Sequence, residues 1–123
     1  IRSNSEPVIN HHKGISGDPE IQKIDSIYVM FYFGAFWPGR NDAFNRFACS
    51  TDLINWTEWY GEDLIKPSED FDNKFAHKSS VVVNKGVVYH FYCAVDSKNN
   101  RGIAVATSVD MGKSKLNFIK TKR

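Results

Sequence analysis

The sequence repeats itself at an offset of 60 residues. At this offset Asp18 falls on Lys78, and the apolar and aromatic positions nearby also coincide: Ile21 with Val81, Ile27 with Val87, and Phe31-Tyr32 with Phe91-Tyr92. After a loop that is two residues shorter in the second copy, the matches continue with Ala48, Ser50 and Asp52 on Ala106, Ser108 and Asp110. A period of this size is typical of folds that repeat one supersecondary unit, such as propellers.

Both copies have the composition of strands. Their apolar segments are rich in β-branched and aromatic residues and are bounded by Gly, Asn, Asp and Ser; they read SIYVMFYFGAF, AFNRFACS, SSVVV, GVVYHFYCAV and GIAVATS. The nearly continuous apolar runs suit strands that are buried on both faces. The sequence therefore predicts an all-β fold made of two four-stranded antiparallel blades of a β-propeller. A small β-sandwich is the alternative, although it leaves the repeat unexplained.

The repeat also predicts how the chain is divided. The first blade is predicted at 18–62 and the second at 63–123, and residues 1–17 are predicted to be the outer strand and linker of a preceding blade. Two blades cannot close a ring, and each blade buries its apolar faces against its neighbours. We therefore expect two exposed hydrophobic faces and further blades, in the same or another polypeptide. Because the sequence starts with Ile1 and not Met, we expect that its natural amino end is missing, either through processing or because the chain is a piece of something longer.

Composition limits the functions that such a chain can have. The 123 residues, 41% of them hydrophobic, are enough for one compact domain. The net charge is only +2 and the basic residues are scattered, apart from GKSKLNFIKTKR at the carboxyl end, so nucleic acid is not an expected partner. No apolar run approaches the roughly 18 residues of a membrane span. Cys49 and Cys93 match no metal-binding spacing and are expected to be free thiols, with a disulfide left open.

Blade geometry brings three kinds of segment to one rim: the starts of the inner strands, the loops between second and third strands, and the linkers between blades. The inner strands begin with Asp18 and Glu20 in the first blade and with His77 and Lys78 in the second, so these four residues are expected to converge on the central channel. Burial and mutual charge shift the pKa values of such groups, which favours acid–base chemistry. The competing interpretation is a structural ion pair between Asp18 and Lys78, with His77 bonded to the backbone.

The same rim carries candidate sugar-binding residues. In FWPGRND, the flat side chain of Trp37 beside Arg40 would suit a pyranose, whose apolar face stacks on an aromatic ring while polar groups bind its hydroxyls. The alternative is that Trp37 packs under the loop. His11 and His12 point opposite ways on an extended chain, so one at most faces the axis, and we assign that position to His12. No metal site is predicted, although a divalent cation held by His77 stays open.

Several stretches resemble a known family. GDPEI, FNRFACSTDLINW, HKSSVVVNKGVVYHFYCAV and RGIAVATS are similar to the blades of five-bladed β-propeller glycoside hydrolases, the clan around families 43 and 117 with its bacterial relatives. The likeness covers nearly the whole chain, which looks like the last two of the five blades.

The resemblance implies hydrolysis of a glycosidic bond in an oligo- or polysaccharide. In such enzymes one acid protonates the leaving oxygen and a second carboxylate activates water, both from the starts of inner strands. Asp18 and Glu20 match carboxylate positions, and His77 matches an acid or a cation ligand. The base would come from an earlier blade. By resemblance alone we expect a bacterial enzyme of the periplasm or the extracellular space; the alternative is a carbohydrate- or protein-binding propeller without turnover.

Overall fold

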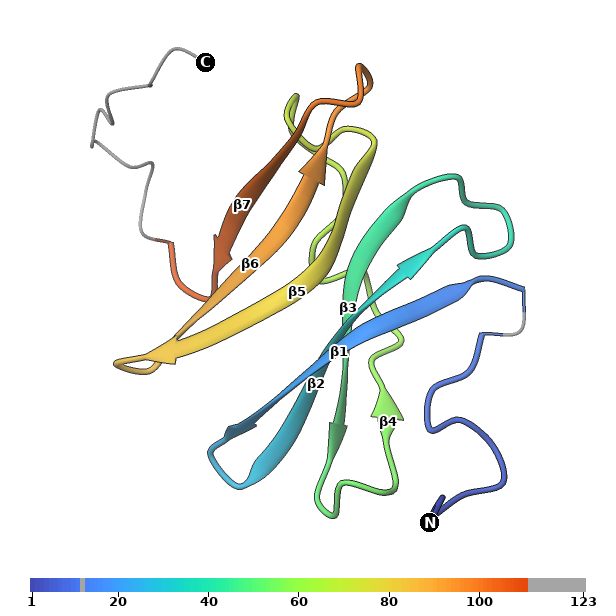
Figure 1. Ribbon diagram of the computed structural model, residues 1–123. Helices are drawn as coiled ribbons and strands as arrows, with labels where there is room; N and C mark the ends of the chain where they lie inside the picture. Colours follow the sequence, from blue (N-terminus) through green and yellow to red (C-terminus); the bar gives the residue numbers. More distant parts are fainter. Residues whose placement is uncertain (12, 111–123) are drawn as a thin grey trace.

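The computed structural model describes residues 1–11 and 13–110 of the chain (Figure 1). These residues contain strands and no helix, which confirms the predicted all-β class. The strands are β1 (Ile15–Ile24), β2 (Ile27–Ala35), β3 (Ala43–Ser50), β4 (Thr57–Glu58), β5 (Phe75–Asn84), β6 (Val87–Val95) and β7 (Arg101–Thr107).

The strands form two antiparallel units, which we call blade 1 (β1–β4) and blade 2 (β5–β7). Only one residue pair, Ala43 with Phe75, joins their ladders. In Figure 1, β1 and β5 lie next to each other in the middle, while β4 and β7 lie at opposite outer edges. Two antiparallel units whose inner strands lie side by side and whose ladders are joined by so little form part of a propeller, as predicted, and not a closed sandwich. A fourth strand of blade 2 would fall in 111–123, outside the described residues.

Strand β1 extends to the amino-terminal side of Asp18. β1 begins at Ile15 and already pairs with Ala35 there, because a bulge between Gly17 and Glu20 accommodates the extra residues without ending the strand. In the described residues before Ile15 there is no strand. The predicted boundaries at 17/18 and 62/63 stay predictions.

The hairpin turns and the β-bulges of the backbone recur at the same offset of 60 residues as the sequence. β1 and β2 are joined by the two residues Asp25-Ser26, and β5 and β6 by Lys85-Gly86. Such short hairpins favour turns that need positive φ angles, and φ is 54° at Asp25, 50° at Lys85 and 77° at Gly86. Bulges also recur at the same offset, between Gly17 and Glu20 in β1 and between His77 and Ser80 in β5.

One of the hydrophobic core clusters of the described residues lies between the two blades. Val29 and Phe31 on one face of β2 pack against Val81 of β5, and all three are buried. At the inner edge, Gln22 donates a 3.0 Å hydrogen bond from Nε2 to the carbonyl of Val81, whose N–H donates to Glu20 Oε1 at 3.5 Å. The apolar contact and these two polar contacts together hold β5 beside β1.

His90 is a polar residue within this interface. It occupies in β6 the repeat position that Met30 occupies in β2, and it is 3% exposed. Neither ring nitrogen has a hydrogen-bond partner in the described part of the chain. The ring borders a cavity of about 190 Å³ whose lining carries no charged group: Phe31, Leu64, Ile65, Val88, His90, Ala106, Thr107 and Ser108. Burial lowers the pKa of His90 from 6.5 to about 4.

This burial makes the stability of the fold depend on pH. The unfolded protein takes up a proton at His90 below pH 6.5, whereas the folded protein does so only near pH 4. The free energy of unfolding should therefore fall by about 3 kcal/mol as the pH is lowered across that range. Urea denaturation at pH 7 and pH 4.5 measures this loss. His90→Met, which restores the residue of the equivalent blade 1 position, should reduce it; an equal loss in both proteins would contradict the assignment.

Candidate functional site

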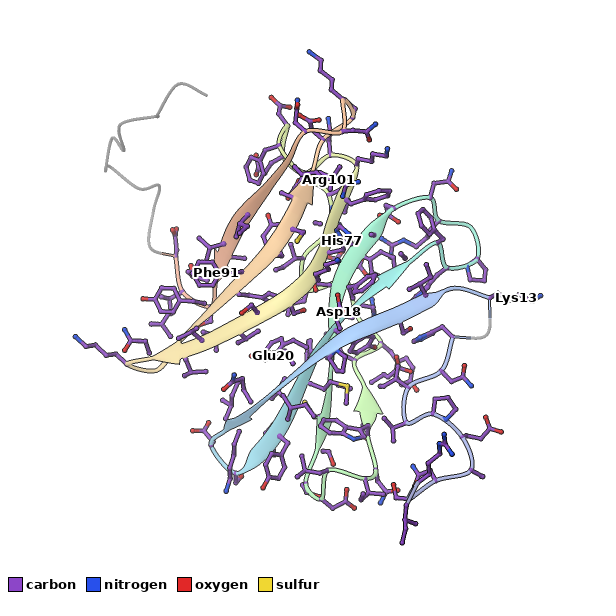
Figure 2. The ribbon with its side chains drawn as sticks, viewed as in Figure 1. Lys13, Asp18, Glu20, His77, Phe91 and Arg101 are labelled. Atoms are coloured by element: carbon purple, nitrogen blue, oxygen red, sulfur yellow. The ribbon has the colours of Figure 1, made fainter. Side chains whose placement is uncertain are left out.

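The bulges of β1 and β5 contain or adjoin the residues predicted as catalytic, Asp18, Glu20 and His77, and Lys78, which was predicted to bind substrate. We call the region of these four residues the pit. Figure 2 places the labelled Asp18, Glu20 and His77 in the space between β1 and β5. The charge of Asp18 acts to raise the pKa of His77, as the smallest of the effects on that ring. The residues lie on two neighbouring inner strands, while their convergence on one channel and their catalytic roles stay predictions.

His77 is held by aromatic rings and by its own blade. The ring is half-buried, with the rings of Phe33 and Phe75 edge-on to it at centroid distances of 5.5 and 5.6 Å. Its Nδ1 lies 3.4 Å from the carbonyl oxygen of Cys93. Gly17, the repeat equivalent of His77, leaves room for the Phe33 ring, since a Cβ there would lie 3.2 Å from that ring. Phe33 therefore spans the gap between the two inner strands beside His77.

The surroundings keep His77 neutral at pH 7. Burial lowers its pKa most, and the positive charges of Lys78 and Arg101 lower it further, against the opposing effects of the Cys93 carbonyl and Asp18. A general acid at neutral pH needs a raised pKa. With the groups that this chain provides, His77 is therefore suited to accept a proton, to form a hydrogen bond or to ligate a cation.

Asp18 and Lys78 do not form the structural ion pair that was the competing interpretation. Both side chains are exposed, and within residues 1–11 and 13–110 neither belongs to an ion pair. Their backbone φ angles are 49° and 63°, in the left-handed region. Glu20 is half-buried and uses Oε1 for Gln22 and Val81, while its other carboxylate oxygen has no partner among the described groups. The pit therefore holds two carboxylate groups with oxygens available for chemistry.

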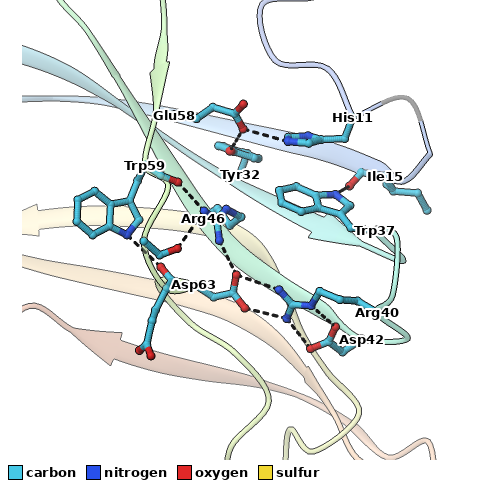
Figure 3. Close-up of polar contacts among 12 residues, drawn as sticks. His11, Ile15, Tyr32, Trp37, Arg40, Asp42, Arg46, Glu58, Trp59 and Asp63 are labelled. Atoms are coloured by element: carbon cyan, nitrogen blue, oxygen red, sulfur yellow. Dashed lines mark hydrogen bonds and ion pairs between the residues drawn. The ribbon is translucent and has the colours of Figure 1, made fainter.

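Trp37 is packed against its neighbours, as the alternative interpretation holds. Its Nε1 donates a 2.8 Å hydrogen bond to the carbonyl of Ile15, and its ring stacks on His11 at a centroid distance of 3.8 Å (Figure 3). The ring also meets Phe44 edge-on. A Cβ at Gly34 would lie 2.7 Å from the indole, so the strand needs glycine there. The predicted stacking on a sugar stays a prediction, and His12 lies outside the described residues.

Arg40 also has partners within the protein. It binds Asp42 through two hydrogen bonds and shares Asp63 with Arg46, which is buried (Figure 3). Hydrogen bonds to Asp42 raise the pKa of Arg40. This network ties the loop after β2 and strand β3 to the linker that follows β4. The structure does not place Trp37 or Arg40 in the pit.

Sequence reasoning did not find one network on blade 1. Glu58 accepts a 2.5 Å hydrogen bond from the Tyr32 hydroxyl and lies 3.2 Å from His11 Nε2, while Ser16 Oγ lies 2.6 Å from His11 Nδ1. Burial and then Glu58 raise the pKa of Tyr32. These partners come from distant parts of the chain and share no local motif, so no sequence signal marks them. The network fixes the amino-terminal segment on blade 1.

The described residues contain no group of three or more His, Cys, Asp and Glu side chains that could hold a metal ion. Cys49 and Cys93 are free and half-buried, one on each blade. In the same residues there is no helix long and apolar enough to cross a membrane.

Two solved structures are similar to this chain over nearly its whole length. It is 54% identical to the protein in a structure named as a BT0996 complex with RGII, over 99% of its own length and 36% of that protein, with a TM-score of 0.82. It is 53% identical to a structure named glycoside hydrolase, over 100% of its own length and 36% of that protein, again with a TM-score of 0.82. The predicted resemblance to glycoside hydrolases is confirmed. No protein-family model and no curated protein matches the sequence.

The chain spans about a third of the length of these two structures. It also resembles the crystal structure of fructan 1-exohydrolase IIa from Cichorium intybus, with 21% identity and a TM-score of 0.66 over 80% of this chain and 19% of that one. At this identity the likeness concerns the fold alone.

The network around Asp63 predicts a large effect on stability. Asp63→Asn leaves the buried Arg46 without its carboxylate and should lower the free energy of unfolding by about 3 kcal/mol. Asp70→Asn, an exposed change in the same linker, should stay within about 0.5 kcal/mol of the parent. Urea denaturation at pH 7 compares the three proteins. Equal stabilities would show that the network contributes nothing.

Proposed function

We propose that this chain supplies two adjacent blades of a glycoside hydrolase that cleaves a glycosidic bond by acid–base catalysis at the propeller axis. The observation that carries the proposal is the 54% identity over 99% of the chain; the presence of Asp18, Glu20 and His77 on two neighbouring inner strands supports it. Two carboxyl groups are what hydrolysis of a glycosidic bond requires.

In this proposal each pit residue has a defined role. Asp18 and Glu20 supply carboxyl groups: one, as the carboxylic acid, protonates the leaving oxygen or, as the carboxylate, stabilises the positive charge that develops on the sugar, and the other, as a carboxylate, orients the reacting water. His77, kept neutral, accepts a proton from that water or a sugar hydroxyl, or ligates a cation. A further catalytic group comes from blades outside this chain.

The exposed apolar faces of the two blades indicate that further blades pack against them. Phe31 is 5% exposed between the blades, whereas its repeat equivalent Phe91 is 39% exposed; Val81 is 4% exposed, whereas Ile21 is 44% exposed. Neighbouring blades, in the same or another polypeptide, would cover Phe91 and Ile21 as blades 1 and 2 cover Phe31 and Val81. We propose an oligosaccharide substrate because the related complex is named for RGII. The resemblance to glycoside hydrolases alone favours the bacterial periplasm or the extracellular space.

Substitution of the carboxylates tests the proposal. In the full-length polypeptide that carries this chain, Asp18→Asn or Glu20→Gln should lower kcat for hydrolysis of an RGII oligosaccharide by about 100-fold or more. Asp25→Asn is the matched control: Asp25 is also exposed and also has a positive φ, of 54°, but lies at the opposite end of β1. It should leave kcat unchanged. Unchanged hydrolysis in both pit variants would remove these carboxylates from the mechanism.

The second candidate is a carbohydrate-binding propeller without turnover, which the lowered pKa of His77 favours because this ring is then not a proton donor at neutral pH. It predicts binding of the same oligosaccharide by calorimetry with no product after prolonged incubation. Product formation by the parent protein excludes it.

A further inference from the structure

Asn45 of β3 is a buried amide that binds the inner strand of the other blade. It is 0% exposed. Its Nδ2 donates a 3.1 Å hydrogen bond to the carbonyl of Ala76, and its Oδ1 accepts a 2.8 Å hydrogen bond from the hydroxyl of Ser79. Both bonds cross from blade 1 to β5. They flank His77 and Lys78, which lie between Ala76 and Ser79 in the sequence, at the bulge of β5.

The backbone of Asn45 is fixed as well as its side chain. Its N–H donates a 2.8 Å hydrogen bond to the carbonyl of Ile65, and its own carbonyl accepts hydrogen bonds from the N–H groups of Leu64 and Ile65 at 2.9 and 3.2 Å. Asn45 thus lies between β2, with which β3 pairs, and the linker that follows β4. A buried amide with so many partners is rigid, so it holds β5 at a fixed place.

The Asn45 side chain binds β5 where backbone pairing between the blades stops. In the described residues one ladder pair joins the blades, Ala43 with Phe75. Two residues further along β3, Asn45 binds β5 through its amide instead. An asparagine side chain carries both a donor and an acceptor, as a peptide group does, so it can bind a strand beside a bulge that interrupts the regular ladder.

This contact is specific to the junction that carries His77. The ladders of β3 and β7 place Ile103 of blade 2 at the position that Asn45 has in blade 1. Pro19 stands in β1 at the repeat position of Ser79. Isoleucine and proline side chains cannot form hydrogen bonds. A contact that served only to join blades would be expected at each junction, whereas this pair occurs where the histidine is.

Blade 1 also contacts the His77 ring directly, through Phe33. Phe33 pairs with Asn45 in the ladder of β2 and β3, and its ring lies edge-on to His77 at a centroid distance of 5.5 Å. Phe75, on the same strand as His77, lies edge-on to that ring at 5.6 Å. Because Asn45 fixes the backbone on both sides of His77, it controls whether the ring stays against Phe33.

We propose that Asn45 is a positioning residue of the pit, which holds the bulge of β5 so that the His77 ring stays against Phe33 of blade 1. This inference rests on the proposed function, because it deepens the role of His77 in the same site. Asn45 touches no substrate and acts through the backbone of β5. Such support matters for rate, since a misplacement of about 1 Å can slow a reaction by about 100-fold.

Nuclear Overhauser contacts between side chains of the full-length polypeptide test the positioning without requiring turnover. Ser79→Ala removes the hydroxyl that binds Asn45 and leaves Asn45 itself in place. The contact between the rings of His77 and Phe33 should then lose intensity, because the bulge is no longer held from blade 1. The contact of His77 with Phe75 should keep its intensity, because both residues lie on β5.

Two further serine variants assign the effect. Ser79→Thr keeps the hydroxyl and should keep the contact of His77 with Phe33. Ser80→Ala is the matched control and should keep it too, since Ser80 is exposed and, within residues 1–11 and 13–110, Asn45 binds Ser79 instead. In hydrolysis of an RGII oligosaccharide, Ser79→Ala should lower kcat about tenfold and leave KM within about twofold, because the change misplaces His77 without removing a substrate contact.

The possible outcomes separate positioning from stability and from the proposed function. An unchanged contact of His77 with Phe33 in Ser79→Ala would overturn the proposal, even where urea denaturation shows a loss of stability. An equal loss of the contact in Ser80→Ala, or an unchanged kcat of an active protein that has lost the contact, would also overturn it. Loss of the contact in Ser79→Ala alone, with no hydrolysis by the parent, would count against the proposed function and leave the positioning in place.

Discussion

The contact of Val81 with Phe31 and Val29 is the constraint on which the rest of the structure depends. It places the inner strand of one blade against the inner half of the other, and the hydrogen bonds of Gln22 and Glu20 to the Val81 backbone fix the spacing of those strands. Burial of three apolar side chains supplies the favourable free energy, at roughly 25 cal/mol per Å² of apolar surface. Because the blades are in contact at Val81, side chains at equivalent positions along β1 and β5 are also brought toward one another.

The pit is a consequence of this packing combined with two bulges. A regular strand would have left Asp18 and Lys78 in ordinary ladder positions, whereas the bulges give both a positive φ and interrupt the pairing with β2 and β6 at the same height. The equivalent bulges of β1 and β5 thus produce one irregular backbone position in each blade. A carboxylate in one blade and a cation in the next thus occupy equivalent irregular positions, and the half-buried His77 precedes the cation.

The sequence was sufficient for features that depend on local signals. The offset of 60 residues predicted equivalent strands, and the structure places hairpin turns and bulges at that offset. It was not sufficient for contacts between distant segments. Trp37 and Arg40 stand beside polar rim residues in sequence, but Ile15 and Asp63 engage them within the fold. The bulge between Gly17 and Glu20, which lets β1 begin at Ile15, has no local sequence signal that we identified.

The central claim is that two adjacent inner strands form one sugar-binding pit. A crystal structure of the full-length polypeptide with a bound RGII oligosaccharide tests it most directly. The account predicts a sugar ring between β1 and β5, with oxygens within hydrogen-bond distance of Asp18 or Glu20 and of His77. An oligosaccharide bound elsewhere on the ring, with the space between these strands filled by side chains of other blades, would contradict it.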